Sequence, residues 1–125
     1  MTEGNMDDTD LKKEHSQGKP VLLIVEDDED LRTQMKWALT GDYGIILAGD
    51  RETAMEKVRS ERPAVMTLDL GLPPAPAGVE EGFQTLSEIL AEDPDVKVII
   101  ITGRGEKEYA LRAVGMGAYD YFYKP

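Results

Sequence analysis

The chain has 125 residues, no cysteine and a formal net charge of -11. The lack of cysteine excludes disulfides and thiolate metal sites, and the acidic charge argues against a nucleic-acid surface, which needs clustered lysine and arginine. A chain of this length is expected to form one domain that folds without disulfides.

The distribution of apolar residues along the sequence also limits where the protein acts. No apolar run is as long as a membrane span, and the N-terminal residues lack the apolar core of a signal peptide. We therefore expect a soluble, cytoplasmic protein with no membrane partner. Residues 1–18 are polar and charged, which predicts a disordered N-terminal tail before a folded domain over 19–125.

From Lys19 onward, apolar runs alternate with helical patterns. Strands are expected at five apolar runs: Val21–Val25, Ile45–Ala48, Ala64–Leu68, Val96–Ile101 and Tyr119–Tyr123. Helices are expected between them, at about Glu29–Thr40, Glu52–Glu61, Glu81–Glu92 and Glu106–Val114. Repeated strand and helix with short connections predict an α/β fold, a doubly wound parallel sheet with right-handed crossovers.

The apolar faces of the helices are readable from their periodicity. The first helix carries Leu31, Met35, Ala38 and Leu39 on one face. The second is expected to direct Ala54, Met55 and Val58 inward, and the third to bury Phe83, Leu86, Ile89 and Leu90.

Five consecutive acids, Glu26 to Asp30, directly follow the first apolar run. The last three of them stand where a helix begins, so we interpret them as capping and dipole residues. Glu26 and Asp27 could have the same structural role if they stood alone. The residues that end the other strands distinguish this pair.

Ligands of doubly wound sheets bind outside the carboxyl ends of the strands. Besides Glu26 and Asp27, Asp69 ends the third strand, Thr102 the fourth and Lys124 the fifth. Two carboxylates about 4 Å apart repel by about 4 kcal/mol at an effective dielectric constant near 20, so this cluster requires a cation or raised pKa values. Mg²⁺ prefers such oxygen ligands.

The same group of side chains is suited to phosphoryl transfer. A carboxylate can act as a nucleophile and carry an acyl phosphate. An ammonium group supplies a compact positive charge, and a hydroxyl supplies a hydrogen-bond donor to the transferred group. Most of the catalysis would then come from positioning.

Four segments contain these strand ends, in this order along the chain: LLIVEDDEDLR, VMTLDLGLP, VIIITGRG and AYDYFYKP. Together they resemble the receiver domain of bacterial two-component response regulators over residues 19–125. The resemblance implies a flavodoxin-like receiver fold with a five-stranded sheet in the order 2-1-3-4-5. It also implies that the domain accepts a phosphoryl group from a sensor histidine kinase and switches an output domain outside this chain.

The resemblance assigns a role to each residue at the strand ends. Asp69 becomes the phosphoacceptor, Glu26 and Asp27 the acidic pair that binds Mg²⁺ with it, and Gly71 a backbone carbonyl ligand of the same ion. Such a domain is not an enzyme beyond its own phosphorylation and dephosphorylation, and a homodimer is a possible assembly.

Three further residues would respond to the phosphoryl group. By resemblance, Lys124 contacts the phosphate, Thr102 is the switch hydroxyl and Tyr121 the aromatic switch. From the residues alone, Thr102 could simply end a strand, and Tyr121 could be an ordinary core or edge aromatic.

The chain departs from the family pattern in two places. The loop between Asp69 and Gly82 is longer than usual and carries Pro73, Pro74 and Pro76, which leaves its path open. The chain also ends at Pro125, where the family has one more helix, so we expect an exposed apolar patch on one face of the sheet.

A narrower resemblance rests on DLGLPP followed by EGFQTL, together with MKWAL. These segments are similar to the receivers of NtrC-like transcription activators associated with PEP-CTERM exopolysaccharide systems. The output would then be transcriptional.

Two other functions remain as alternatives. An Mg²⁺-dependent Asp-phosphate hydrolase would also place a nucleophilic aspartate after an apolar strand, but it needs a second aspartate two positions later, where this chain has Gly71. A receiver-like binding module would keep the fold without being phosphorylated. A nucleotide-binding P-loop is absent from the sequence.

Overall fold

The computed structural model describes residues 18–74 and 78–124, and within them it forms one five-stranded sheet. The strands lie in the order β2-β1-β3-β4-β5, and every neighbouring pair is parallel. Their bounds are β1 Val21–Val25, β2 Gly44–Ala48, β3 Val65–Asp69, β4 Lys97–Thr102 and β5 Asp120–Tyr123. The predicted doubly wound sheet and its strand order are confirmed.

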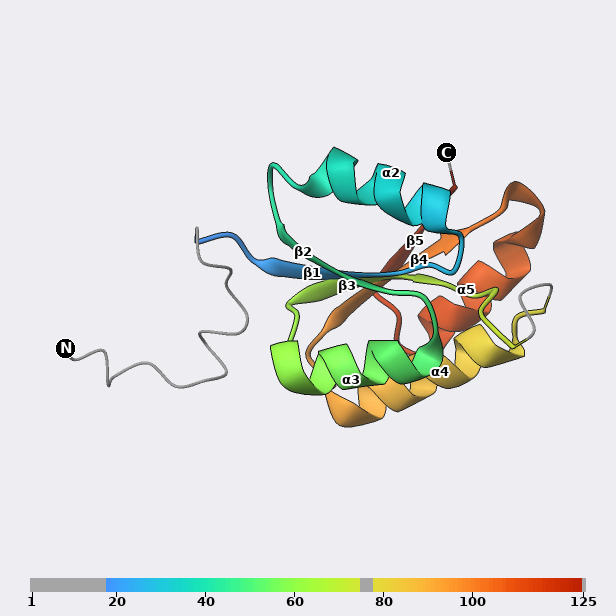
Figure 1. The fold of residues 1–125 in the computed structure, drawn as a ribbon. Coiled ribbons are helices and arrows are strands. Elements are labelled where there is room, and N and C mark those ends of the chain that lie inside the picture. Colours follow the sequence, from blue (N-terminus) through green and yellow to red (C-terminus); the bar gives the residue numbers. More distant parts are fainter. Residues whose placement is uncertain (1–17, 75–77, 125) are drawn as a thin grey trace.

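Helices cover both faces of the sheet, but unequally. Figure 1 shows α2 on one face and α3, α4 and α5 on the other. Their bounds are α2 Glu29–Leu39, α3 Arg51–Glu61, α4 Glu80–Glu92 and α5 Lys107–Gly115, with a short 3-10 turn, η2, at Arg104–Glu106. Among the described residues, no helix is both long and apolar enough to cross a membrane. The predicted tail, apart from Gly18, lies outside the described residues.

The hydrophobic core lies between the sheet and the three helices α3, α4 and α5. All five residues of β1 are buried, as expected for an interior strand of a parallel sheet that is covered on both faces. From α3, the predicted residues Ala54, Met55 and Val58 are buried. From α4, the buried residues include Phe83, Leu86 and Ile89, as predicted, whereas Leu90 is half-buried and packs at the edge of the core.

The α2 face is open by comparison. No residue of α2 is buried: Leu31, Met35 and Leu39 are half-buried, and Ala38 is exposed, so the predicted face is only partly covered. Beside α2 runs a groove of about 520 Å³, lined mainly by apolar residues of α2 and of the strands β1, β3, β4 and β5, with Phe122 57% exposed. The expected apolar patch is present.

Side-chain caps fix where α2 and α3 begin. The Asp28 carboxylate accepts hydrogen bonds from the backbone N–H groups of Asp30, at 2.9 Å, and Leu31, at 3.1 Å. Asp50 accepts one from the Thr53 N–H at 2.8 Å. Because these carboxylates satisfy free N–H groups of the first turn, the acids after Glu26 and Asp27 are confirmed as helix-starting residues.

The backbone of α4 lies directly against the segment that leaves β3. A Cβ atom on Gly82 would lie 2.3 Å from the Cα and O atoms of Leu70, so only glycine permits this approach. At the other side of α4, the Arg51 side chain of α3 binds Glu81 at 2.6 Å and Glu88 at 3.1 Å. The Gly82 approach places α4 against Leu70, the residue that follows Asp69, and the ion pairs of Arg51 join α4 to α3. Of the long loop, residues 75–77, which include Pro76, lie outside the described part of the chain.

Candidate functional site

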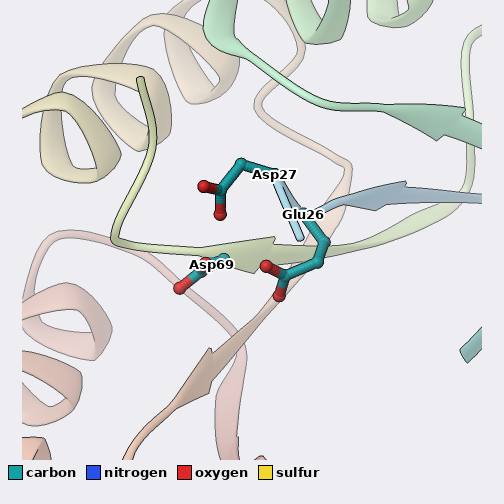
Figure 2. A group of neighbouring side chains, drawn as sticks. All are labelled: Glu26, Asp27 and Asp69. Carbon is teal, nitrogen blue, oxygen red and sulfur yellow. The ribbon is translucent and has the colours of Figure 1, made fainter. Parts of the chain in front are cut away.

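The predicted acidic residues meet at one edge of the sheet. β1 and β3 are neighbours with Val25 opposite Leu68, so Glu26 and Asp69 follow at the same level. Carboxylate oxygens of Glu26, Asp27 and Asp69 lie within 4.8 Å of one another (Figure 2). The structure therefore brings together three side chains that the sequence placed at the ends of two different strands.

Glu26 is the most buried member of this acidic cluster. It is 1% exposed, and its Oε2 accepts a hydrogen bond from the Asp28 N–H at 3.1 Å. Its other oxygen, Oε1, is buried without a hydrogen-bond partner. Burial, followed by the negative charge of Asp69, raises the pKa of Glu26 to about 8. A buried acid with one unsatisfied oxygen is a costly arrangement, which a cation would relieve.

Asp69 is also buried, at 5% exposure, and each of its oxygens is held. Oδ1 accepts the Gly71 N–H at 3.1 Å, and Oδ2 lies 3.4 Å from the Lys124 ammonium. Burial raises the pKa of Asp69, although the Gly71 N–H and the charge of Lys124 oppose this rise. Asp69 is the last residue of β3 and not the first of the loop, so the sheet itself fixes its backbone.

Lys124 joins the site from the far edge of the sheet. Its Nζ lies 3.4 Å from Asp69 and 3.9 Å from Glu26 Oε1. Partial burial lowers the pKa of Lys124, but the nearby charges of Asp69 and Glu26 outweigh it, so the net direction is upward. The residue therefore stays charged and partly balances the acidic cluster.

Asp27 and Gly71 complete the predicted ligand set with less support from other contacts. Asp27 is half-buried and contributes a carboxylate oxygen to the acidic cluster. Gly71 is half-buried, and its N–H, not its carbonyl, makes the recorded contact with Asp69. The predicted ligand role of its carbonyl stays a prediction.

Thr102 is buried at the end of β4, next to Asp69 on the neighbouring strand. The register pairs Asp69 with Ile101, so Thr102 is the next residue along. Its hydroxyl donates to Glu106 Oε1 at 3.1 Å. Sequence analysis did not single out Glu106, although a glutamate three residues after Gly103, at a helix start, is a capping pattern that could have indicated it.

Tyr121 lies two strand positions before Tyr123, and both point to the same face of β5. Its ring is half-buried, packs against the core and meets Tyr123 edge-on with centroids 6.0 Å apart. The intervening Phe122 points to the opposite face, toward the groove beside α2. The predicted switch role of Tyr121 stays a prediction.

Two further contacts were not evident from the sequence. Arg32 of α2 donates through Nη1 to the Glu26 carbonyl at 2.7 Å, which fixes the backbone where β1 ends. Gly49 leaves room for this guanidinium, because a Cβ there would lie 2.8 Å from Nη1. No sequence pattern around Arg32 or Gly49 indicates this contact.

The site thus combines two buried carboxylates, one half-buried carboxylate and one ammonium at the carboxyl ends of parallel strands. The profile of the response regulator receiver domain family matches residues 22–125. The chain belongs to this family.

Similar proteins come from several bacteria. The receiver is 36% identical over 105 residues to the transcriptional regulatory protein KdpE of Staphylococcus aureus, covering 83% of this chain and 43% of KdpE. It is 32% identical over 105 residues to the nitrogen assimilation regulatory protein NtrX of Azorhizobium caulinodans, covering 83% and 22%. It is 31% identical over 107 residues to the chemotaxis protein CheY of Listeria monocytogenes, covering 83% and 85%.

A solved structure is also similar to this chain in fold. The receiver domain of NtrX from Brucella abortus superposes with a TM-score of 0.76 at 30% identity, covering 83% of this chain and 85% of that one. The chain therefore spans most of the length of the CheY relative, but less than half of KdpE and NtrX.

Proposed function

We propose that Asp69 accepts a phosphoryl group from a sensor histidine kinase and that this modification switches an output domain. The observation that carries the proposal is the environment of Asp69. A buried carboxylate that accepts the Gly71 N–H at 3.1 Å and faces Lys124 at 3.4 Å, beside two more acids, suits a nucleophile for phosphoryl transfer.

The acidic cluster fits Mg²⁺ on two observations. It offers three carboxylates within 4.8 Å of one another, and Glu26 Oε1 is a buried oxygen without a hydrogen-bond donor. Glu26, Asp27 and Asp69, with the carbonyl of Gly71, are the residues that would hold the ion. When bound, Mg²⁺ supplies positive charge that offsets the negative charge of the transferring group.

The side chains of the site have separate roles in phosphoryl transfer and in the conformational switch that follows it. A carboxylate oxygen of Asp69 forms a bond to phosphorus, while the bond from phosphorus to the histidine nitrogen breaks and its electron pair stays with the imidazole. The Lys124 ammonium offsets charge on the phosphoryl oxygens. Thr102 then donates its hydroxyl to the phosphoryl group, and Tyr121 turns inward behind it, which biases a two-state equilibrium.

The output is proposed to be transcriptional. The similar proteins KdpE and NtrX are regulatory proteins much longer than this chain, and KdpE is named as a transcriptional regulator. The narrower resemblance to regulators of PEP-CTERM exopolysaccharide systems points the same way. The domain would act in the cytoplasm, without contacting nucleic acid or membrane itself, and without an enzymatic activity beyond its own phosphorylation and dephosphorylation.

The test is incubation with acetyl phosphate and Mg²⁺ followed by intact mass measurement. The expected result is a mass gain of one phosphate that Asp69→Asn abolishes and that chelation of Mg²⁺ prevents. Asp42→Asn, at an exposed turn, is the matched control and should be phosphorylated normally. No mass gain despite Mg²⁺ binding would refute the proposal and favour a binding module.

The same mixture separates a receiver from a hydrolase. Release of inorganic phosphate should be slow and limited by breakdown of the Asp69 acyl phosphate, since Gly71 stands where a hydrolase has its general acid. Rapid multiple turnover with no stable phosphorylated species would favour the hydrolase instead.

A further inference from the structure

The Thr102 hydroxyl is already occupied in this structure. It donates to Glu106 Oε1 at 3.1 Å, and the same oxygen accepts the Gly103 N–H at 3.0 Å. A hydroxyl has a single proton to donate. While Thr102 donates to Glu106, it has no proton for a phosphoryl oxygen on Asp69.

The position of Glu106 follows from the backbone of the turn between β4 and α5. The Glu106 N–H donates to the Gly103 carbonyl at 3.1 Å, so backbone and side chain both fold back onto Gly103. A Cβ on Gly103 would lie 3.3 Å from Glu106 Oε1, a tight distance, so the glycine gives the carboxylate room. The carboxylate is therefore held over the end of β4.

The backbone of Thr102 is held as well. Its carbonyl accepts the Lys124 N–H at 2.8 Å, and the residue belongs to β4. The hydroxyl can thus reach a new acceptor by rotation of the side chain, without movement of the strand. The contact that opposes this rotation is the hydrogen bond to Glu106.

We propose that Glu106 is a positioning residue that holds the Thr102 hydroxyl in the resting state and sets how strongly the domain responds to phosphorylation. This inference rests on the proposed function of Asp69. Phosphorylation exchanges one charge-assisted hydrogen bond of Thr102, to the carboxylate, for another, to the phosphoryl group. Removing Glu106 removes the competing acceptor, so the phosphorylated conformation becomes easier to reach.

The test measures the affinity for beryllofluoride, a mimic of the aspartyl phosphate, by calorimetry in Mg²⁺. Glu106→Ala is expected to raise the affinity about tenfold, equivalent to about 1.4 kcal/mol. Glu108→Ala is the matched control: Glu108 is an exposed acid in the first turn of α5, so its loss changes the charge equally but frees no hydroxyl. Its effect should be much smaller.

A double-mutant cycle separates positioning from simple charge removal. Thr102→Val removes the hydroxyl, so Glu106→Ala should have little further effect in that background. An equal effect of Glu106→Ala with and without the hydroxyl would overturn the inference. Nuclear magnetic resonance supplies a second measurement, in which the Gly103 amide proton should shift upfield in Glu106→Ala. An unmoved Gly103 amide would also overturn the inference.

The outcomes distinguish this inference from the proposed function. If the wild-type domain binds beryllofluoride and is phosphorylated, but Glu106→Ala behaves like Glu108→Ala, the positioning role of Glu106 is refuted and the phosphoacceptor role of Asp69 stands. If the wild-type domain neither binds beryllofluoride nor gains phosphate, both are refuted.

Discussion

The burial of Glu26 predicts an unusual pH dependence of stability in the absence of divalent cations. The pKa of this carboxyl is about 8 in the folded protein, against an ordinary value of 4.5. Between these values the folded protein retains a proton that the unfolded chain has lost. The folded state therefore binds more protons than the unfolded state in this range. Because a rise in pH favours the state with fewer bound protons, the free energy of unfolding must fall as the pH rises from about 5 to about 8.

The size of the effect follows from the same two pKa values. Each pKa unit corresponds to about 1.4 kcal/mol, so a difference of this size makes ionised Glu26 cost a few kcal/mol of unfolding free energy by pH 8. Glu26→Gln is neutral at every pH and should remove most of the decline. Asp69, whose pKa is also raised, accounts for what remains, while Lys124 does not titrate in this range.

Urea unfolding followed by circular dichroism, at several pH values between 5 and 8.5 with chelator present, measures this directly. The wild-type protein should lose stability across the range, and Glu26→Gln should lose much less. Glu56→Gln, which changes an exposed acid of α3, should follow the wild type. A Glu26→Gln profile as steep as the wild-type profile would refute the assignment of the decline to this carboxyl.

Three further substitutions test other parts of the structure. Gly82→Ala drives a Cβ into the backbone of Leu70, so it should cost about 1–3 kcal/mol in urea unfolding and, because Leu70 adjoins the acceptor, also weaken Mg²⁺ binding measured by calorimetry; full retention of both would contradict the close approach. Lys124→Gln removes the ammonium of the site and should slow phosphorylation by acetyl phosphate on the order of a hundredfold in mass-spectrometric time courses, whereas an unchanged rate would show that this charge is not used. Asp50→Ala removes the cap on the Thr53 N–H and should cost about 1 kcal/mol in urea unfolding while leaving phosphorylation unchanged, and a loss of phosphorylation would reveal a role beyond capping.

The strands were predictable because buried strands of a parallel sheet are nearly all apolar. The run Val21–Val25 was located to the residue, since acids bound it on one side and it is buried on both faces. The predicted ranges of the third and fourth strands stop one residue short of Asp69 and Thr102, whereas in the structure both residues belong to their strands. Polar residues at a strand end look like loop residues in a sequence, but backbone pairing with neighbouring strands extends over them.

Burial was less predictable than helix position. The periodicity of Leu31, Met35 and Leu39 gives the face of α2 correctly, but all three are only half-buried. How deeply a helix face is buried depends on what lies beside it on the sheet, and periodicity holds no information about that neighbour. In this structure a groove lies beside α2, and Met35 and Leu39 line it and are therefore only half-buried.

The individual roles within the site were the least predictable. Glu26 and Asp27 are adjacent in sequence, yet one is buried with an unsatisfied oxygen and the other is half-buried. Successive side chains point in different directions as a strand ends, so equal acids meet unequal surroundings. The bond from Thr102 to Glu106 likewise depends on the path of a short turn, which composition does not determine.

The charges of the site explain why its stability and its function are linked. Three carboxylates and one ammonium, if all ionised, carry a net charge of -2, which one divalent cation would neutralise. Without a cation the folded protein reduces the repulsion by keeping a proton on Glu26, so cation binding must displace that proton and should strengthen as the pH rises toward 8. The fold tolerates this unfavourable cluster because the fully buried β1 strand anchors its base in the core. Because a bound cation relieves this repulsion in the folded protein only, the free energy of unfolding should rise with the concentration of divalent cation.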